Sequence, residues 1–478
     1  QQLTKPIGSK LVYRTKYSAN GEYIKHKARL VALGFQGELG RDFFSTFSPM
    51  SSMTSIRILL TIAVRYKLPI YIADVPNAFI RSYINALTQL ALPSGVSFVH
   101  QGRSTDPKSS RPLGIRLIRA LYGLKQSPQE WNKRLAFDLM TYGFTRMHSD
   151  TSVFCKRHDD GTFIVVATEV DDLLIIASNQ QRIDEFHHYL KQTYQITEFG
   201  KIDSYFGIRF RHDLDNGTLS MDMTVKIQDF FKKHPKLSTV GVHLSPSPSD
   251  DAVLDESSPK SDVETYILDN YRSIVGFLIF PSITVRPDFA YEVARAARVM
   301  HAPTRQGIHR LIHFLGYVLH TATAKLIYRR ADTAAHRHFQ NLPDFVTCVG
   351  QPLAPAELQS DRIIGFTDAN FAPKDEPRRR STSGYCFFLY GNLVSWKSKL
   401  QPITAGSTHD AELIAGALAS DESAWLRKWL VELSSLLQVP SLLVSNAANL
   451  LGDNLASVFT ANNPVTSTRS RHLDVRYF

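Results

Sequence analysis

The feature that most constrains this chain is a pair of adjacent carboxylates, Asp171-Asp172, between two apolar runs. The runs Phe163-Ile164-Val165-Val166 and Leu173-Leu174-Ile175-Ile176 are rich in β-branched residues, which predicts two buried strands joined by a tight turn at residues 169–172. Neighbouring acids at the edge of an apolar hairpin repel one another unless a cation lies between them, and a divalent metal is the usual solution. Solvated turns also carry such pairs, so the motif alone leaves both interpretations open.

A second acid lies at the end of another apolar stretch. Residues 70–75 predict a strand that closes with Asp74-Val75. If this strand lies beside the hairpin, Asp74, Asp171 and Asp172 share one site. Three carboxylates can hold two Mg²⁺ ions for in-line nucleotidyl transfer, in which one ion activates the attacking oxygen and the other neutralises the leaving pyrophosphate. A strand-end or capping role for Asp74 fits the same position.

Ordered motifs then resemble one known family. Asp74-Val75-x-x-Ala78-Phe79, Leu121-Tyr122-Gly123-Leu124-Lys125-Gln126-Ser127-Pro128-x-x-Trp131 and Val170-Asp171-Asp172 resemble, in this order, the reverse transcriptase motifs of copia-type LTR retrotransposons. Residues 27–35 and 46–49 are similar to the family's fingers segment and to the lead into its palm. Its connection and RNase H segments are similar to residues 271–276, 286–291, 381–385 and 395–399. The resemblance therefore runs from about residue 6 to the last residue.

The resemblance implies an α+β multidomain fold: a right-hand polymerase with fingers, palm and thumb, then a helical connection and an α/β RNase H-like domain. The expected domains are 1–235 (reverse transcriptase fingers and palm), 236–355 (thumb and connection) and 356–478 (RNase H-like). Helical periodicity is expected over residues 59–66, 131–140, 271–280, 290–300 and 307–320. Ser, Pro and Asp dominate residues 241–262, which predicts a mobile linker or a surface loop there.

The same resemblance implies an RNA-directed DNA polymerase with RNase H activity, and Mg²⁺ as cofactor, two ions per active site, with Mn²⁺ as an alternative. Asp74, Asp171 and Asp172 would hold the polymerase ions. Phe79 resembles the aromatic steric gate beneath the incoming sugar, although a core aromatic would look the same. Other residues resemble those that contact the triphosphate, template or nucleotide, although a solvated strand face or a turn is also compatible: Lys27, Arg29, Tyr122, Gly123 and Gln126.

A second acidic constellation lies in the C-terminal stretch. Asp368 closes an apolar strand, and Glu412 lies in the first turns of an amphipathic helix. By resemblance to RNase H, Asp368, Glu412, Asp453 and Asp474 would bind two metal ions that activate water against an RNA phosphodiester. The alternative Asp410 could instead cap the helix and interact with its dipole. Individually, each of these acids could be a turn or cap residue.

One departure from the family pattern leaves a second reading open. Glu169 stands where the family usually has an aromatic residue near the primer, and a third carboxylate there would repel the nucleic-acid backbone unless it points away or pairs with a basic neighbour. Residues 446–449 also interrupt the strand expected before Asp453. The alternative function is therefore a catalytically impaired nucleic-acid-binding relic of such an element.

Composition agrees with a nucleic-acid partner. The chain has 478 residues, 43% of them apolar, a net charge of +11 and a pI near 9.4, which suits several buried cores and a polyanionic ligand. Three cysteines are too few for a disulfide framework and imply a reducing compartment. No apolar run is long enough for a membrane span, and the start without Met suggests a piece of a larger polyprotein.

The resemblance finally implies the partners and the location. The expected partners are an RNA template, a DNA primer, the RNA-DNA hybrid, deoxynucleoside triphosphates and the integrase and capsid parts of the same polyprotein, with no membrane. The expected location is the cytoplasm, within a virus-like particle, followed by entry into the nucleus.

Overall fold

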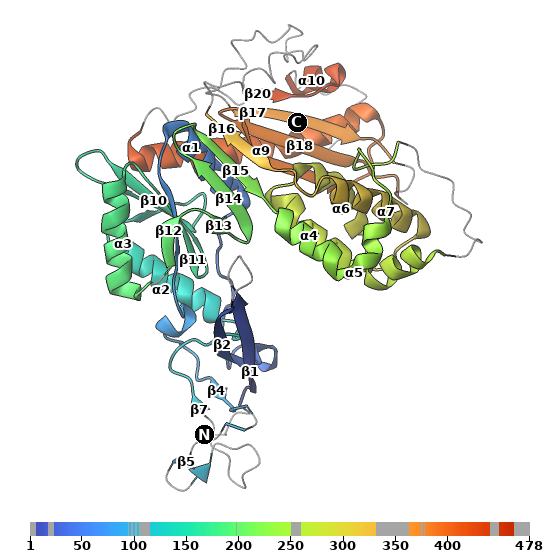
Figure 1. Cartoon of the computed structure of the whole chain (residues 1–478). Helices are drawn as coiled ribbons and strands as arrows, with labels where there is room; N and C mark the ends of the chain where they lie inside the picture. Colours follow the sequence, from blue (N-terminus) through green and yellow to red (C-terminus); the bar gives the residue numbers. More distant parts are fainter. Residues whose placement is uncertain are drawn as a thin grey trace. The chain divides into compact units, whose positions relative to one another are not determined.

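The computed structural model describes residues 6–17, 23–93, 95–96, 99–100, 103–104, 115–196, 198–249, 260–330, 363–373, 376, 378–439 and 449–462. The chain forms two compact units, which are interleaved in sequence. Unit 1 comprises Gln1–Ser51, Tyr71–Ile175 and Gln180–Gly200, and unit 2 comprises Ser52–Ile70, Ile176–Asn179 and Lys201–Phe478. Figure 1 labels their elements along the chain.

Unit 1 is built on a six-stranded sheet. In spatial order its strands are β12 (Glu198–Lys201), β3 (Ile70–Asp74), β11 (Asp172–Ala177), β10 (Phe163–Glu169), β9 (Val153–Arg157) and β8 (Thr145–Arg146). The expected hairpin is confirmed, because β10 and β11 are neighbours and only Val170 and Asp171 separate them. Val170 adopts a left-handed conformation with φ of 50°, which turns the chain sharply between two strands whose apolar residues are buried.

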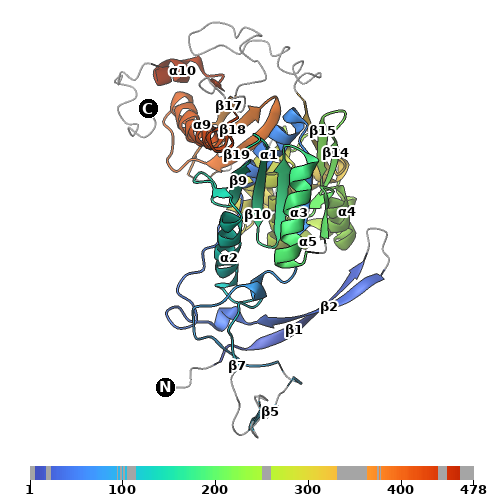
Figure 2. The ribbon, with the colours of Figure 1, turned by 90° about the vertical axis from the view of Figure 1, so that its left-hand side faces the viewer.

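Helices and a long hairpin complete unit 1. Helix α3 (Gln180–Tyr194) packs on β10, as Figure 2 shows. Helix α2 (Ser127–Thr141) has Pro128 in its first turn, where a missing backbone N–H costs nothing. The remaining elements are β1 (Ser9–Tyr17), β2 (Tyr23–Ala32), η1 (Gly34–Gln36), η2 (Phe79–Arg81), β4 (Gln89–Leu90), β5 (Val99–His100), β6 (Arg103–Ser104) and β7 (Ile115–Arg116).

Unit 2 contains two four-stranded sheets and most of the helices. One sheet is ordered β13 (Ser204–Tyr205), β14 (Ile208–Asp213), β15 (Thr218–Asp222) and β16 (Leu326–Arg329). The other is ordered β19 (Asn392–Leu400), β18 (Thr382–Leu389), β17 (Ile363–Asn370) and β20 (Asn449–Leu451), and α9 (Thr408–Leu437) packs on it. Strand β20 runs parallel to β17, whereas the β17–β18 and β18–β19 pairs are antiparallel.

The other helices of unit 2 include all those expected from periodicity in this part of the chain. They are α1 (Met53–Tyr66), α4 (Thr224–Lys233), η3 (Pro235–Thr239), α5 (Asp262–Thr284), η4 (Pro287–Phe289), α6 (Ala290–Arg298), α7 (Arg305–His320) and α10 (Leu455–Asn462). Helix α5 begins with a capping box, in which the Ser261 side chain accepts from the Glu264 amide and the Glu264 side chain accepts from the Ser261 amide. Helix α1 begins at the cap Ser52 and ends at Lys67, whose φ is 53°.

The described part of the Ser/Pro-rich segment is a surface loop rather than a mobile linker. Ser247 donates to Glu292 of α6 at 2.6 Å, and the carbonyl of Ser245 is hydrogen-bonded by His313 of α7 at 2.9 Å. Two such contacts offset part of the chain entropy that composition alone leaves uncompensated. Residues 250–259 lie outside the described residues.

The expected division at residues 235 and 355 stays a prediction, because residue 355 lies outside the described residues and the compact units are interleaved. Among the described cysteines, Cys155 and Cys386 form no disulfide, and Cys348 is not among the described residues. No helix in the described ranges is both long and apolar enough to cross a membrane.

Candidate functional sites

The first site lies at one end of two neighbouring strands of unit 1. Asp74 is the last residue of β3, Asp172 is the first residue of β11, and Asp171 lies in the turn before it. The two strands are adjacent, and the Val75 amide donates to the Asp171 carbonyl at 2.8 Å. The sheet therefore brings Asp74, which is distant in sequence, to the same edge as the adjacent pair Asp171 and Asp172.

Burial and mutual repulsion act on these acids. Burial, with the nearby Asp74 charge as the second cause, raises the pKa of Asp171 to about 6 and that of Asp172 to about 6. The Tyr122 hydroxyl donates to Asp171 Oδ2 at 3.3 Å, whereas buried Asp171 Oδ1 has no hydrogen-bond partner among the described residues. An unsatisfied carboxylate oxygen beside a second acid is the environment that a divalent cation relieves.

Among the described residues, Asp74, Asp171 and Asp172 do not form a tight cluster of metal ligands. Within the described ranges, the group of acids whose ligand atoms all lie within 4.8 Å of one another is a different one, and it lies in unit 2. The expected convergence of Asp74, Asp171 and Asp172 is thus confirmed as shared location on adjacent strands, but not as a tight cluster.

Several predicted substrate residues gather near Asp171. The Phe79 ring lies 4.7 Å from the Tyr122 ring, centroid to centroid, and the Arg29 guanidinium lies 5.6 Å from the same Tyr122 centroid. The positive charges of Arg29 and Lys27 partly oppose the rise in the pKa of Asp171. One aromatic pair and two cations therefore lie near Asp171.

Two residues of the Tyr122 motif have internal contacts that the sequence did not reveal. Gly123 has φ of +89°, and a Cβ built there would lie 2.1 Å from the Ala32 carbonyl oxygen, so this glycine allows two protein backbones to meet. Gln126 is 5% exposed, and its side-chain amide donates to the Asp42 carbonyl at 2.9 Å. Their predicted contacts with nucleotide or template stay predictions.

Glu169 is not an exposed third carboxylate. It is 8% exposed, and burial raises its pKa to about 7, against the opposing effect of the Ser51 backbone amide. A glutamate with this pKa carries about half a negative charge at neutral pH. The expected repulsion of a nucleic-acid backbone is therefore weaker than the sequence suggested, because Glu169 points into the protein from the last position of β10.

The second site is the tight acidic cluster of unit 2. Asp368 of β17, Glu412 of α9 and Asp453, which follows β20, offer ligand atoms that all lie within 4.8 Å of one another. The parallel pairing of Phe366 with Leu451 carries Asp453 to Asp368. Burial, then the Asp368 charge, raises the pKa of Glu412 to about 7, and burial with Asp453 also raises the pKa of Asp368.

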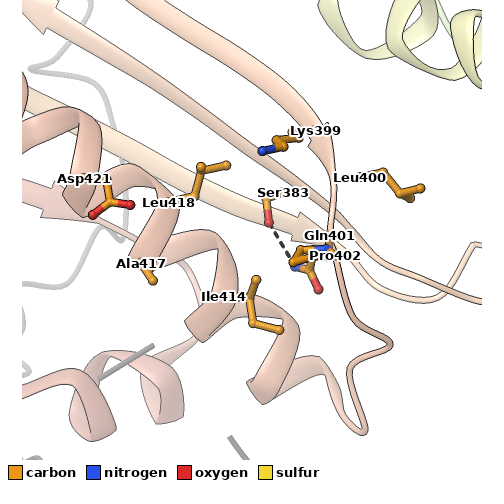
Figure 3. Close-up of a pocket in the computed structure, with 9 residues that line it drawn as sticks. All are labelled: Ser383, Lys399, Leu400, Gln401, Pro402, Ile414, Ala417, Leu418 and Asp421. Atoms are coloured by element: carbon orange, nitrogen blue, oxygen red, sulfur yellow. Dashed lines mark hydrogen bonds between the residues drawn. The ribbon is translucent and has the colours of Figure 1, made fainter. Parts of the chain in front are cut away.

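The start of α9 is held so that Glu412 faces the strand. The Ala369 amide donates to Glu412 Oε1 at 3.2 Å. Gln401 donates to the Ala411 carbonyl at 2.8 Å and to Ser383 Oγ at 3.0 Å, and Figure 3 shows the second bond. These contacts tie the first turn of α9 to the sheet.

The choice between Glu412 and Asp410 agrees with this geometry. Glu412 belongs to the cluster, and Asp410 does not. Asp410 is not the cap, because the Ser407 side chain accepts from the Asp410 amide at 3.1 Å, but Asp410 does lie in the first turn of α9, where an acid interacts favourably with the helix dipole. Asp474, the fourth acid expected here, lies outside the described residues.

A cavity of about 860 Å³ opens at Asp368 and Asp453. One wall comes from β17, β18 and β19, including Trp396, and the other from residues 287–291. Sequence reasoning missed Arg57, whose contacts with the elements that lead to these walls are described below. A signal was present, because Arg57 is a lone cation in the apolar run Ile56-Arg57-Ile58-Leu59-Leu60.

Comparison with known proteins identifies the chain. Residues 2–233, which carry Asp74, Asp171 and Asp172, match the family model described as "Reverse transcriptase (RNA-dependent DNA polymerase)". This part of the chain is thus a reverse transcriptase domain by family. Over nearly its whole length, the chain is similar to Pol polyproteins of copia-like transposons, as the following relatives show.

The Pol polyprotein from transposon TNT 1-94 of Nicotiana tabacum is 26% identical over 99% of this chain and 32% of its own length. The Pol polyprotein from transposon RE1 of Arabidopsis thaliana is 28% identical over 98% of this chain and 28% of its own length. A transposon Ty5-1 protein of Saccharomyces cerevisiae is 28% identical over 72% of this chain and 98% of its own length. The chain thus spans about a third of the first two relatives.

Proposed function

We propose that this chain is an RNA-directed DNA polymerase whose catalytic acids are Asp74, Asp171 and Asp172. The observation that supports this most directly is the family match over residues 2–233 together with the convergence of the three acids at one sheet edge. The carboxylate set, with one buried unsatisfied oxygen on Asp171, fits Mg²⁺, which prefers oxygen ligands. Asp74, Asp171 and Asp172 would hold two such ions, which would supply activation of the primer 3′-hydroxyl and neutralisation of the leaving pyrophosphate.

The chain's own residues would bind and orient the nucleotide. Lys27 and Arg29 lie on the same face of β2, two positions apart, and their charges suit a triphosphate. Phe79 and Tyr122 form a rigid edge-to-face pair that would lie beneath the sugar. The fold proposed for residues 1–235 is the fingers and palm of a right-hand polymerase, with the thumb and helical connection of residues 236–355 containing α5 to α7.

We further propose an RNase H-like nuclease at Asp368, Glu412 and Asp453, with Asp474 as a fourth ligand. The tight 4.8 Å group, gathered from a strand, a helix and the end of a parallel strand, supports this assignment, and its three carboxylates fit Mg²⁺ or Mn²⁺. Glu412, whose pKa is about 7, would lose its proton when the cation binds. The substrates proposed are an RNA template, a DNA primer, deoxynucleoside triphosphates and the RNA-DNA hybrid.

The decisive experiment measures both reactions with the full chain and Mg²⁺. Primer extension on an RNA template should be lost in Asp171→Asn, and RNA cleavage in a preformed hybrid should be lost in Asp368→Asn. Asp269→Asn, at an exposed position of α5, is the matched control and should retain both activities. If the wild-type chain bound the hybrid but performed neither reaction, it would be the impaired relic instead.

A further inference from the structure

A buried arginine joins three elements of unit 2. Arg57 of α1 is 3% exposed, and its guanidinium donates to three backbone carbonyls. Nε donates to Val394 of β19 at 2.7 Å, and Nη1 donates to Ile283 at 2.8 Å and to Thr284 at 3.1 Å, both at the end of α5. Burial lowers the pKa of Arg57 to about 10, so the side chain stays charged at neutral pH.

Each of these carbonyls needs a partner from elsewhere. Ile283 and Thr284 are the last residues of α5, where helical carbonyls lack intrahelical donors and where a cation is favourable. Val394 lies at a register shift of β19, because Leu393 pairs with Phe388 while Ser395 pairs with Phe387. Such a bulge leaves one residue without a ladder partner and redirects its backbone, here toward Arg57.

Trp396 closes the same junction. The Arg57 guanidinium lies 3.8 Å from the centroid of the Trp396 ring, a cation–π distance. The Trp396 indole N–H donates to the Ser282 carbonyl at 2.7 Å, one position before the carbonyls that Arg57 binds. Arg57 and Trp396 thus connect β19 with the end of α5 through four hydrogen bonds and one ring contact.

The two elements joined in this way lead to opposite walls of the cavity at the acidic cluster. The end of α5 continues into residues 287–291, which form one wall, and Trp396 itself belongs to the other. Trp396 pairs with Cys386, and Cys386 pairs with Phe366, which lies two positions before Asp368 on β17. A change at the junction would therefore be transmitted to both the walls and the strand that carries Asp368.

We propose that Arg57 is a positioning residue for the acidic site of unit 2, and that it sets the separation of the β19 wall from the α5–η4 wall. Helix α1 lies inside the segment that matches the reverse transcriptase family, so that segment supplies a structural part of the C-terminal site. This inference rests on the proposed nuclease only where hybrid cleavage is measured. The measurement of amide hydrogen exchange does not depend on that function.

The test compares full-length Arg57→Lys, Trp396→Phe and the double variant with Arg427→Lys, an exposed control on α9. Lysine keeps the charge but lacks the planar fork that reaches two elements. In Arg57→Lys we expect kcat for hybrid cleavage to fall about ten-fold or more, while KM stays within about three-fold, because the displaced groups act in the transition state and the hybrid is held by many phosphate contacts. Primer extension should be retained.

Two further measurements separate a positioning role from general damage. Amide hydrogen exchange should rise together over residues 282–286 and 392–397 in Arg57→Lys and remain unchanged in Arg427→Lys. The fold-reduction in cleavage activity of the double variant should be no more than about twice that of Arg57→Lys, because the effects of coupled residues do not add. Additive losses, or unchanged exchange at either wall, would overturn the proposal.

Failure of the proposed nuclease would be recognised separately. If the wild-type chain cleaved no hybrid, the nuclease assignment would be wrong, and exchange alone would decide about Arg57. Joint loosening of both walls would then support the junction. Joint loosening with an unchanged kcat in an active enzyme would show that the junction does not position the acids.

Discussion

Gly123→Ala should destabilise unit 1 through a backbone contact and should also disturb the nucleotide site. The added Cβ would lie 2.1 Å from the Ala32 carbonyl oxygen and 2.7 Å from Val31 Cγ1. Favourable carbon–oxygen contacts occur at about 3.3 Å, so the two backbone segments must separate by about 1 Å. That movement stretches the hydrogen bond from the Ala32 amide to the Tyr122 carbonyl, which is 2.8 Å long.

The magnitude follows from two contributions. Holding alanine at φ of +89° costs about 1 to 3 kcal/mol. Losing the Ala32–Tyr122 bond and relieving the clash adds about 1 to 2 kcal/mol. Gly40→Ala is the matched control, because Gly40 has φ of +84° and no atom lies within 4 Å of the point that a Cβ would occupy, so only the first cost applies. The entropy that alanine removes from the unfolded chain is the same in both variants.

Urea-induced unfolding of both variants measures this difference. We expect Gly123→Ala to lower the free energy of unfolding by about 1 to 2 kcal/mol more than Gly40→Ala does. The KM for the nucleotide in primer extension should rise in Gly123→Ala only, since Tyr122 moves relative to Asp171 and Phe79. Equal destabilisation and equal KM in the two variants would refute the close-approach explanation.

Three further outcomes are expected. Glu169 has a pKa of about 7 in the fold against 4.5 unfolded, so its cost to stability is absent at low pH, grows as pH rises from about 4.5 to about 7, and is constant above that; Glu169→Gln should raise the free energy of unfolding by about 3 kcal/mol at pH 8 and leave it nearly unchanged at pH 4, as denaturation at both pH values will show. Because the pKa of Glu412 is raised to about 7, Mn²⁺ binding measured by titration calorimetry should strengthen from pH 6 to pH 8, and Glu412→Gln should remove most of that dependence. Ser261→Ala should cost about 1 kcal/mol in thermal denaturation, since it removes the side-chain half of the α5 capping box; an unchanged melting temperature would contradict that role.

Local patterns in the sequence determined the positions of the strands and of their acids. The two apolar runs that flank Asp171-Asp172 predicted the hairpin turn. The helical spacing after Asp410 predicted the helix that carries Glu412. Both are short-range properties: a strand or a helix of this composition has one apolar face to bury, and the acids then fall at its end. The choice of Glu412 over Asp410 came from the resemblance to the RNase H helix and not from the spacing alone.

Only the tertiary structure decided how distant groups contact one another. It buried Glu169, satisfied the Gln126 amide with the Asp42 carbonyl, and placed the Ala32 backbone against Gly123. It also turned Arg57 of α1 toward carbonyls more than two hundred positions later in the chain. Backbone carbonyls are present at every residue, so no sequence pattern marks which of them will lack a partner. That depends on where helices end and strands bulge once the elements have packed.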